Sequence, residues 1–207
     1  MHRLILIGYM GVGKTTLGKA LAKATGLAFY DLDWYIESRM RRTVKQLFDE
    51  RGEEGFRLIE QRMLHEVAEF ENVVISCGGG TPCFFDNMDY MNRQGHTLYL
   101  KATPDVILEH LRMSKNVRPL LLDKTDEQKR LFIEQQLEQR RAFYEKAQTT
   151  VDVTTLDSKE KIAQAVAGIV EKLHLPAAQQ SHTHTQPLPK GGEARTTITN
   201  HQSNCQQ

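Results

Sequence analysis

A glycine-rich segment near the start of the chain has the clearest chemical signature. Residues 8–15 read Gly-Tyr-Met-Gly-Val-Gly-Lys-Thr and fit the pattern GxxxxGK[ST]. The glycines let backbone N–H groups turn toward phosphate oxygens, Lys14 can reach terminal phosphates, and the Thr15 hydroxyl can bind Mg²⁺. The segment predicts a nucleotide phosphate loop, with an accidental glycine-rich turn as the alternative. The expected nucleotide contacts here are Gly11, Val12, Gly13, Lys14, Thr15 and Thr16.

Two aspartates follow the next short apolar segment. Asp31 and Asp33 are two residues apart, and side-chain alternation along a strand would place both carboxylates on one side. At the carboxyl end of a strand in an α/β sheet they would lie near the nucleotide. One could hold Mg²⁺ through water, and the other could accept a proton from a hydroxyl. Taken alone, such a pair is more often a helix cap or a turn.

An arginine and a run of glycines are candidates for binding a second ligand. Arg57 lies between apolar positions of a helical pattern, one turn before Glu60, which could orient its guanidinium. A solvated helix arginine is the alternative. Residues 78–80 are all glycine and follow the strand-like segment 73–76, at the edge where ligands bind in open α/β sheets. They admit close backbone approach, with a plain flexible loop as the alternative.

Further arginines surround a polar segment in the second half of the chain. Arg112 and Arg118 bracket lysine-bearing residues, and Arg140 with Arg141 comes later on a predicted helix. Beside a phosphate loop, these residues suit a lid that brings positive charge to a transferred phosphoryl group and keeps water out. We therefore predict a mobile lid over about residues 112–124.

The elements that must position these residues alternate in type. Strand-like segments at 4–7, 29–31, 73–75, 97–100 and 151–153 are separated by helical patterns. The helices are expected at 14–24, 54–70, from Pro104 after an N-cap at Thr103, at 125–146 after a capping box, and after a cap at 157–160. Strands separated by helices favour an α/β fold whose parallel sheet is covered on both faces.

Composition limits the functional classes. The 207 residues are 40% apolar and 26% charged, as in globular proteins, and the net charge of +1 gives no diffuse field for nucleic acid or membranes. No run approaches 18 apolar residues, and glycines with Lys14 interrupt the only signal-like start. Three cysteines without disulfide or metal spacing favour a reducing compartment. We expect a cytoplasmic protein that binds neither nucleic acid nor membrane.

The composition changes after residue 175. Residues 176–207 contain no aromatic residue and, of the large aliphatic residues, only Leu188 and Ile198. Such a segment cannot bury enough apolar surface to offset the entropy lost on ordering. We expect one folded domain over 1–175 and a low-complexity, disordered tail over 176–207.

Considered together, the motifs resemble those of the shikimate kinase family, in family order and near family spacing. The resemblance implies a three-layer αβα P-loop kinase fold with a central parallel five-stranded sheet and a mobile lid. It implies a monomeric enzyme that transfers the γ-phosphate of ATP to the 3-hydroxyl of shikimate, with Mg²⁺, on the common-precursor route to aromatic amino acids. The residues that carry it are 8–15, 31–33, 52–57, 78–80, 118–120 and 140–144.

The resemblance also implies roles for residues on the nucleotide side. Lys14 would steady the β- and γ-phosphates and take part in catalysis, and Thr15 with Asp31 would hold Mg²⁺. Arg118 would be the catalytic lid residue at the phosphates. Arg112 would stack on or border adenine, the least secure of these assignments because the lid segment is variable in character.

On the acceptor side, Asp33 would contact the shikimate hydroxyls and position or deprotonate the nucleophile. Arg57 and Arg140 would clamp the carboxylate, since guanidinium groups pair bidentately with planar carboxylates, and the Gly79 and Gly80 backbone would close the site. An apolar wall against the carbocycle is implied for Val44, Phe48 and Phe56, with ordinary core as the alternative.

Three other functions compete with this one. Gluconate and nucleoside monophosphate kinases share the loop and lid, and the combination of Arg57, Arg140 and Asp33 argues against them. A GTPase-type switch would need an Asn-Lys-x-Asp signature, and the nearest match, at residues 123–126, lies at the end of the predicted lid. A kinase that binds without turnover is disfavoured because all motif residues are present.

Overall fold

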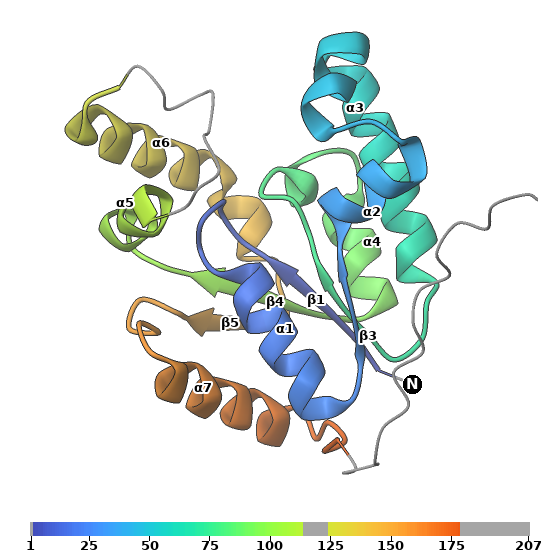
Figure 1. The fold of residues 1–207 in the computed structure, drawn as a ribbon, viewed down its shortest axis with the longest axis vertical. Helices are drawn as coiled ribbons and strands as arrows, with labels where there is room; N and C mark the ends of the chain where they lie inside the picture. The colour runs from blue at the N-terminus through green and yellow to red at the C-terminus, as the bar shows by residue number, and fades with distance from the viewer. Residues whose placement is uncertain (1, 114–123, 179–207) are drawn as a thin grey trace, which may run out of the picture.

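The computed structural model describes residues 2–113 and 124–178, in which five parallel strands form one sheet in the order β2-β3-β1-β4-β5 (Figure 1). Helices separate consecutive strands, as the sequence predicts, because parallel neighbours need a crossover connection. The elements are β1 (Arg3–Ile7), α1 (Lys14–Thr25), β2 (Ala28–Asp31), α2 (Leu32–Met40), α3 (Val44–Ala68), β3 (Val73–Ser76), η1 (Thr81–Cys83), α4 (Asn87–Gln94), β4 (His96–Lys101), α5 (Pro104–Met113), α6 (Asp126–Tyr144), β5 (Thr149–Asp152) and α7 (Lys159–Lys172).

The sheet carries a hydrophobic core on each face. Alternation along β1 sends Leu4 and Leu6 into a core with side chains of α1, α5 and α7, and sends Ile5 and Ile7 into a second core with side chains of α2, α3 and α4. All four side chains are buried. A sheet buried on both faces confirms the predicted three-layer α/β architecture.

The strand register brings three chain segments to one edge of the sheet. Ser76 at the end of β3 is level with Asp31 at the end of β2 and with Leu6 of β1. The phosphate loop after β1, Asp31, and the glycines after β3 therefore share this edge. Gly8 has φ +140°, and a Cβ atom there would lie 2.6 Å from the Leu100 carbonyl oxygen. Only glycine therefore fits where the loop leaves β1 and passes β4.

The structure corrects two local predictions. Asp33 does not continue β2, because α2 begins at Leu32 and puts Asp33 in a first helical turn; the strand-alternation argument for the aspartate pair is therefore wrong. The cap of α7 is Ser158, whose Oγ accepts from the Lys161 N–H at 3.2 Å, while the Asp157 carboxylate pairs with the Lys161 ammonium at 2.9 Å. The capping box at Thr125 is confirmed.

Three short elements and one extension were not predicted. Helices α2 and α4 have nine and eight residues, too short for a strong periodic pattern, and η1 is a single turn. Helix α3 begins at Val44, ten residues before the predicted start, and continues across a kink at Gly52, where φ is +67°. This kink projects the first part of α3 above the sheet edge (Figure 1).

Two predicted segments fall mainly outside the described residues. Residues 114–123, with Arg118, belong to the predicted lid, and residues 179–207 belong to the predicted tail. Leu173 and Leu175 still pack on the core beyond α7. No helix in the described ranges is both long and apolar enough to cross a membrane.

Candidate active site

The side chain of Lys14 binds the backbone of its own phosphate loop. Lys14, the first residue of α1, is 9% exposed, and its ammonium donates to the Gly8 and Tyr9 carbonyl oxygens at 2.8 and 2.9 Å. Gly11 and Gly13 have φ of +78° and +97°, a region where glycine is favoured. The loop thus has the backbone conformation and the buried positive charge that a phosphate site needs.

A pair of oxygen ligands lies beside Lys14. The Thr15 hydroxyl, at the N-terminus of α1, donates to Oδ2 of Asp31 at 2.9 Å. A hydroxyl and a carboxylate at this separation fit Mg²⁺, which binds proteins through a few oxygen ligands and completes its shell with water and substrate phosphates. Among the described residues, no group of three or more His, Cys, Asp or Glu could hold a metal alone.

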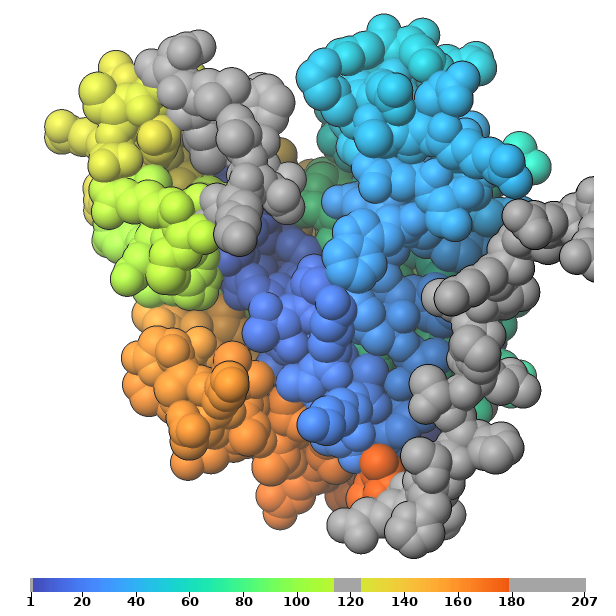
Figure 2. All heavy atoms as spheres, viewed as in Figure 1, coloured from blue at the N-terminus to red at the C-terminus, as the bar shows by residue number. Residues whose placement is uncertain are grey.

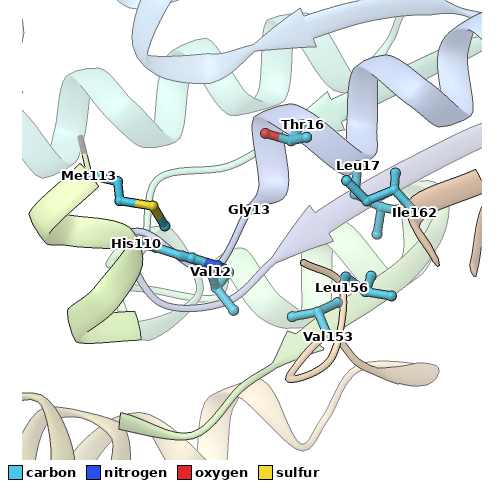
Figure 3. A pocket seen from close by; sticks show the side chains of 9 residues that line it. All are labelled: Val12, Gly13, Thr16, Leu17, His110, Met113, Val153, Leu156 and Ile162. Carbon is cyan, nitrogen blue, oxygen red and sulfur yellow. The ribbon is translucent and has the colours of Figure 1, made fainter. Parts of the chain in front are cut away.

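An apolar cavity of about 260 Å³ adjoins the phosphate loop. Figure 3 shows His110 and Met113 of α5 on one side and Leu17 of α1 with Ile162 of α7 on the other. The His110 ring nitrogen Nδ1 lies 2.9 Å from the Gly11 carbonyl oxygen and so ties α5 to the loop. The lining residues are Val12, Gly13, Thr16, Leu17, His110, Met113, Val153, Leu156 and Ile162.

Arg112 has a different environment. It does not line this cavity, although both His110 and Met113 do. Its guanidinium pairs with the Asp126 carboxylate at 2.6 Å, and both side chains are 54% exposed. The hydrogen bond to Arg112 lowers the pKa of the Asp126 carboxyl. This ion pair joins the two helices that border the predicted lid.

Arg57 is a buried, oriented arginine. Its side chain is 13% exposed and pairs with the Glu60 carboxylate at 2.8 Å, so the predicted orienting role of Glu60 agrees with the geometry and the solvated interpretation is wrong. Glu60 is itself 1% exposed and also accepts from the Thr81 hydroxyl at 2.6 Å. The Arg57 guanidinium stacks on Phe84 at 4.1 Å from the ring centroid. Its Nε is buried and has no partner among the described residues.

The three glycines lie against the charged side chains of the site. A Cβ at Gly80 would lie 2.9 Å from Nη2 of Arg57, and one at Gly79 would lie 3.5 Å from Nη1 of Arg140. One at Gly78 would lie 3.2 Å from Oδ1 of Asp33. Close approach, rather than a plain flexible loop, accounts for these glycines.

The apolar residues implied by the resemblance are near Arg57. Phe48 and Phe56 stack with ring centroids 4.2 Å apart, and the Arg57 guanidinium lies 5.6 and 5.4 Å from these centroids. Phe56 is buried in the core and Val44 packs against the same core. The core interpretation therefore holds for Phe56, and Phe48 extends the core toward the site.

Several residues of the site carry no clear sequence signal. Phe84 follows η1 and stacks on Arg57. His110 and Leu156 line the same cavity although they are distant in the chain. The Tyr144 hydroxyl lies 2.6 Å from the carbonyl oxygen of Gly79, which is 65 residues away in the sequence. A helical pattern could show that Tyr144 faces inward, but not what its hydroxyl reaches.

Gly80→Ala should raise the acceptor KM by about 10- to 100-fold, because the added methyl would displace the Arg57 guanidinium from its pocket. Gly80 has φ −89° and ψ −22°, which alanine adopts readily, so the effect is steric. Gly168→Ala is the matched control: a Cβ there meets nothing within 4 Å, and alanine favours the α7 helix. Steady-state kinetics check both, and an unchanged KM in Gly80→Ala would contradict the arrangement.

The fold and this site define a class of enzyme. Helices α2 and α3 rise on one side of the phosphate loop and α5 and α6 on the other (Figure 1), and the same two groups of helices form the blue-to-cyan and green-to-yellow regions of Figure 2. On one side lie a phosphate loop and magnesium-type ligands, and on the other lie two arginines and an aspartate at a glycine loop. These are the parts of a P-loop small-molecule kinase.

Comparison with known proteins identifies the family. A family model described as shikimate kinase matches residues 10–171. The chain is 54% identical to the shikimate kinase of Phocaeicola vulgatus over 174 residues, 84% of this chain and 99% of that protein. The chain belongs to the shikimate kinase family.

Solved structures agree with this assignment. The crystal structure of shikimate kinase from Bacteroides thetaiotaomicron has a TM-score of 0.82 and 53% identity, and the match covers 84% of this chain and 99% of that one. Shikimate kinase from Acinetobacter baumannii, in complex with shikimate, has a TM-score of 0.72 and 30% identity, covering 84% and 93%.

Proposed function

We propose that this chain transfers the γ-phosphate of ATP to the 3-hydroxyl of shikimate, giving shikimate 3-phosphate and ADP. The observation that carries the proposal is the convergence of Arg57 from α3 and Arg140 from α6 on the adjacent glycines 80 and 79. Two guanidinium groups at one small loop suit a planar carboxylate, which they can bind bidentately. Gluconate also carries a carboxylate and a nucleoside monophosphate carries a phosphate that arginines bind, so the family match over residues 10–171 is what favours shikimate over both.

On the acceptor side, Asp33 is proposed to orient or deprotonate the attacking hydroxyl. Its carboxylate lies by Gly78, two residues from the glycine next to Arg57, so one ring compound could meet both groups. The terminal nitrogens of Arg57 lie at Gly80, and we propose that they donate to the acid group of shikimate.

On the donor side, Lys14 would leave its loop carbonyls for the β- and γ-phosphates, and Gly11 through Thr16 would surround them. Mg²⁺, held through Thr15 and Asp31, would neutralise charge on the phosphate oxygens when bound. The nucleobase would occupy the apolar cavity. Arg112, which pairs with Asp126 and does not line the cavity, would have to leave that pair to border the base, and Arg118 would approach the phosphates from the lid. The apolar lining from α1, α5 and α7 suits a flat base.

The proposed working form is a monomer in the cytoplasm. The monomer is what the resemblance to the shikimate kinase family implies. The cytoplasm supplies the ATP that the reaction consumes.

The acceptor assignment can be tested by coupled measurement of ADP release at fixed MgATP. We expect turnover with shikimate and only background rates with gluconate or a nucleoside monophosphate. Turnover with either of those compounds, together with none with shikimate, would reverse the assignment.

A further inference from the structure

Arg140 is held by neutral groups, unlike Arg57. One of its terminal nitrogens donates to Oε1 of Gln136 at 2.8 Å, and its guanidinium lies 5.4 Å from the centroid of the Tyr9 ring. In the described ranges, the ion pairs within 4.0 Å include Arg57 with Glu53 and Glu60, but none for Arg140. In these ranges, the contacts of the Arg140 guanidinium therefore include an amide oxygen and an aromatic face.

Tyr144 links this arginine to the glycine loop. It is fully buried at the last residue of α6, and its hydroxyl donates to the Gly79 carbonyl oxygen at 2.6 Å. Arg140 lies one turn earlier on the same helix. Burial raises the pKa of the Tyr144 hydroxyl, and the nearby Arg140 guanidinium acts in the opposite direction. The phenol stays protonated and can donate and accept at once.

This arrangement has a consequence for binding an acid. A carboxylate beside Arg140 would fix its position but would also compete with the carboxylate of the ligand. An amide oxygen and an aromatic face hold it without that competition, and the Tyr144 hydroxyl fixes the loop carbonyl beside it. A guanidinium placed in advance loses less conformational entropy when the ligand binds.

We propose that Tyr144 is a positioning residue for acceptor binding, whose hydroxyl fixes the Gly79 carbonyl beside Arg140 in the geometry that receives the acid group. The proposal rests on the proposed function, in which Arg140 contacts the carboxylate of shikimate. Tyr144 itself acts through Arg140 and Gly79 rather than on the reacting atoms.

The test is Tyr144→Phe, which removes the hydroxyl and keeps the ring. We expect the KM for shikimate to rise about tenfold, the size of the one lost hydrogen bond to the Gly79 carbonyl, and the KM for ATP to stay within about twofold. Thermal unfolding, with a Tm lowered by a few degrees at most, checks that the variant is folded.

The chain provides a matched control in Tyr99→Phe. Tyr99 packs against Tyr144 with ring centroids 5.1 Å apart and is 7% exposed, and its side chain borders a separate cavity with Lys101 and Asp152. Tyr99→Phe removes a phenol hydroxyl, as Tyr144→Phe does, but from the other ring of the pair. We expect both KM values of Tyr99→Phe to match those of the unmodified protein.

A neutral acceptor separates positioning from general structural support. The compound is shikimate with a hydroxymethyl group in place of the carboxylate. Tyr144→Phe should lower kcat/KM for shikimate about tenfold relative to the unmodified protein and leave kcat/KM for the alcohol unchanged, since the alcohol makes no use of the Arg140 charge.

The outcomes separate the two proposals. Equal losses with the acid and the alcohol, or a Tyr144→Phe that matches Tyr99→Phe, would overturn the positioning role while leaving the proposed function intact. No turnover of shikimate by the unmodified protein would overturn the proposed function, and the role of Tyr144 in acceptor binding with it.

Discussion

Lys14→Met is expected to lower kcat by about 10²- to 10³-fold with any acceptor that the enzyme accepts. The ammonium is buried, where a charge acts more strongly than in water, and the proposed role of Lys14 is to contact the transferred phosphate. Methionine keeps most of the length of the side chain but removes the charge and the donors to the Gly8 and Tyr9 carbonyls. Coupled ADP release at saturating MgATP measures the loss.

The control for this prediction lies on the same helix. Lys23→Met removes an exposed lysine in the last turn of α1, and it should leave kcat unchanged. A Lys14→Met enzyme that keeps more than about a tenth of the normal kcat would show that the loop lysine shapes the loop without stabilising the transition state.

Arg57→Ala is expected to raise the KM for shikimate by about 100-fold and to change the KM for ATP little. Loss of one partner of a close charge pair costs about 2–5 kcal/mol, and each 1.4 kcal/mol is a factor of ten. The effect should fall on the acceptor because Arg57 lies at Gly80, next to the acceptor aspartate and away from the apolar cavity by the loop. Equal changes in both KM values would mean that Arg57 is structural.

The same substitution has a cost for folding. Without Arg57, the 1%-exposed Glu60 carboxylate still accepts the hydrogen bond from the Thr81 hydroxyl but has lost its ion-pair partner. A buried carboxylate without that partner lowers the stability of the fold. Arg57→Lys retains a charge near Glu60 and should unfold at a higher temperature than Arg57→Ala. It should still raise the shikimate KM, because lysine lacks the planar fork. Arg62→Ala, at an exposed position on α3, is the control for both.

The phosphate loop shows how far local patterns reach. Its glycines, lysine and threonine are consecutive, and so are the strand before it and the helix after it. Backbone conformation in such a segment depends on residues within a few positions, and the predicted helix at 14–24 differs from α1 by one residue. The capping box at Thr125 was predictable for the same reason.

The aspartate pair shows where local patterns fail. Two aspartates separated by one residue can end a strand, but such a pair is more often a helix cap or a turn, and here Asp31 is the N-cap of α2. Packing of Leu32 and Ile36, both fully buried, makes the chain turn into α2 directly after Asp31. Asp33 reaches the glycine loop from that helix, and the strand geometry proposed for it does not occur.

The list of chemical groups could be read from the amino-acid order: a phosphate loop, acidic side chains after the second strand, and arginines on two later helices. That these groups lie at one site could not be read from that order, because Arg57 and Arg140, for example, are 83 positions apart in the chain. The strand order β2-β3-β1 and its register align three loops at one edge, and α3 and α6 then bring the two guanidinium groups to neighbouring glycines. Backbone conformation depends on nearby residues, whereas side-chain convergence depends on how distant elements pack.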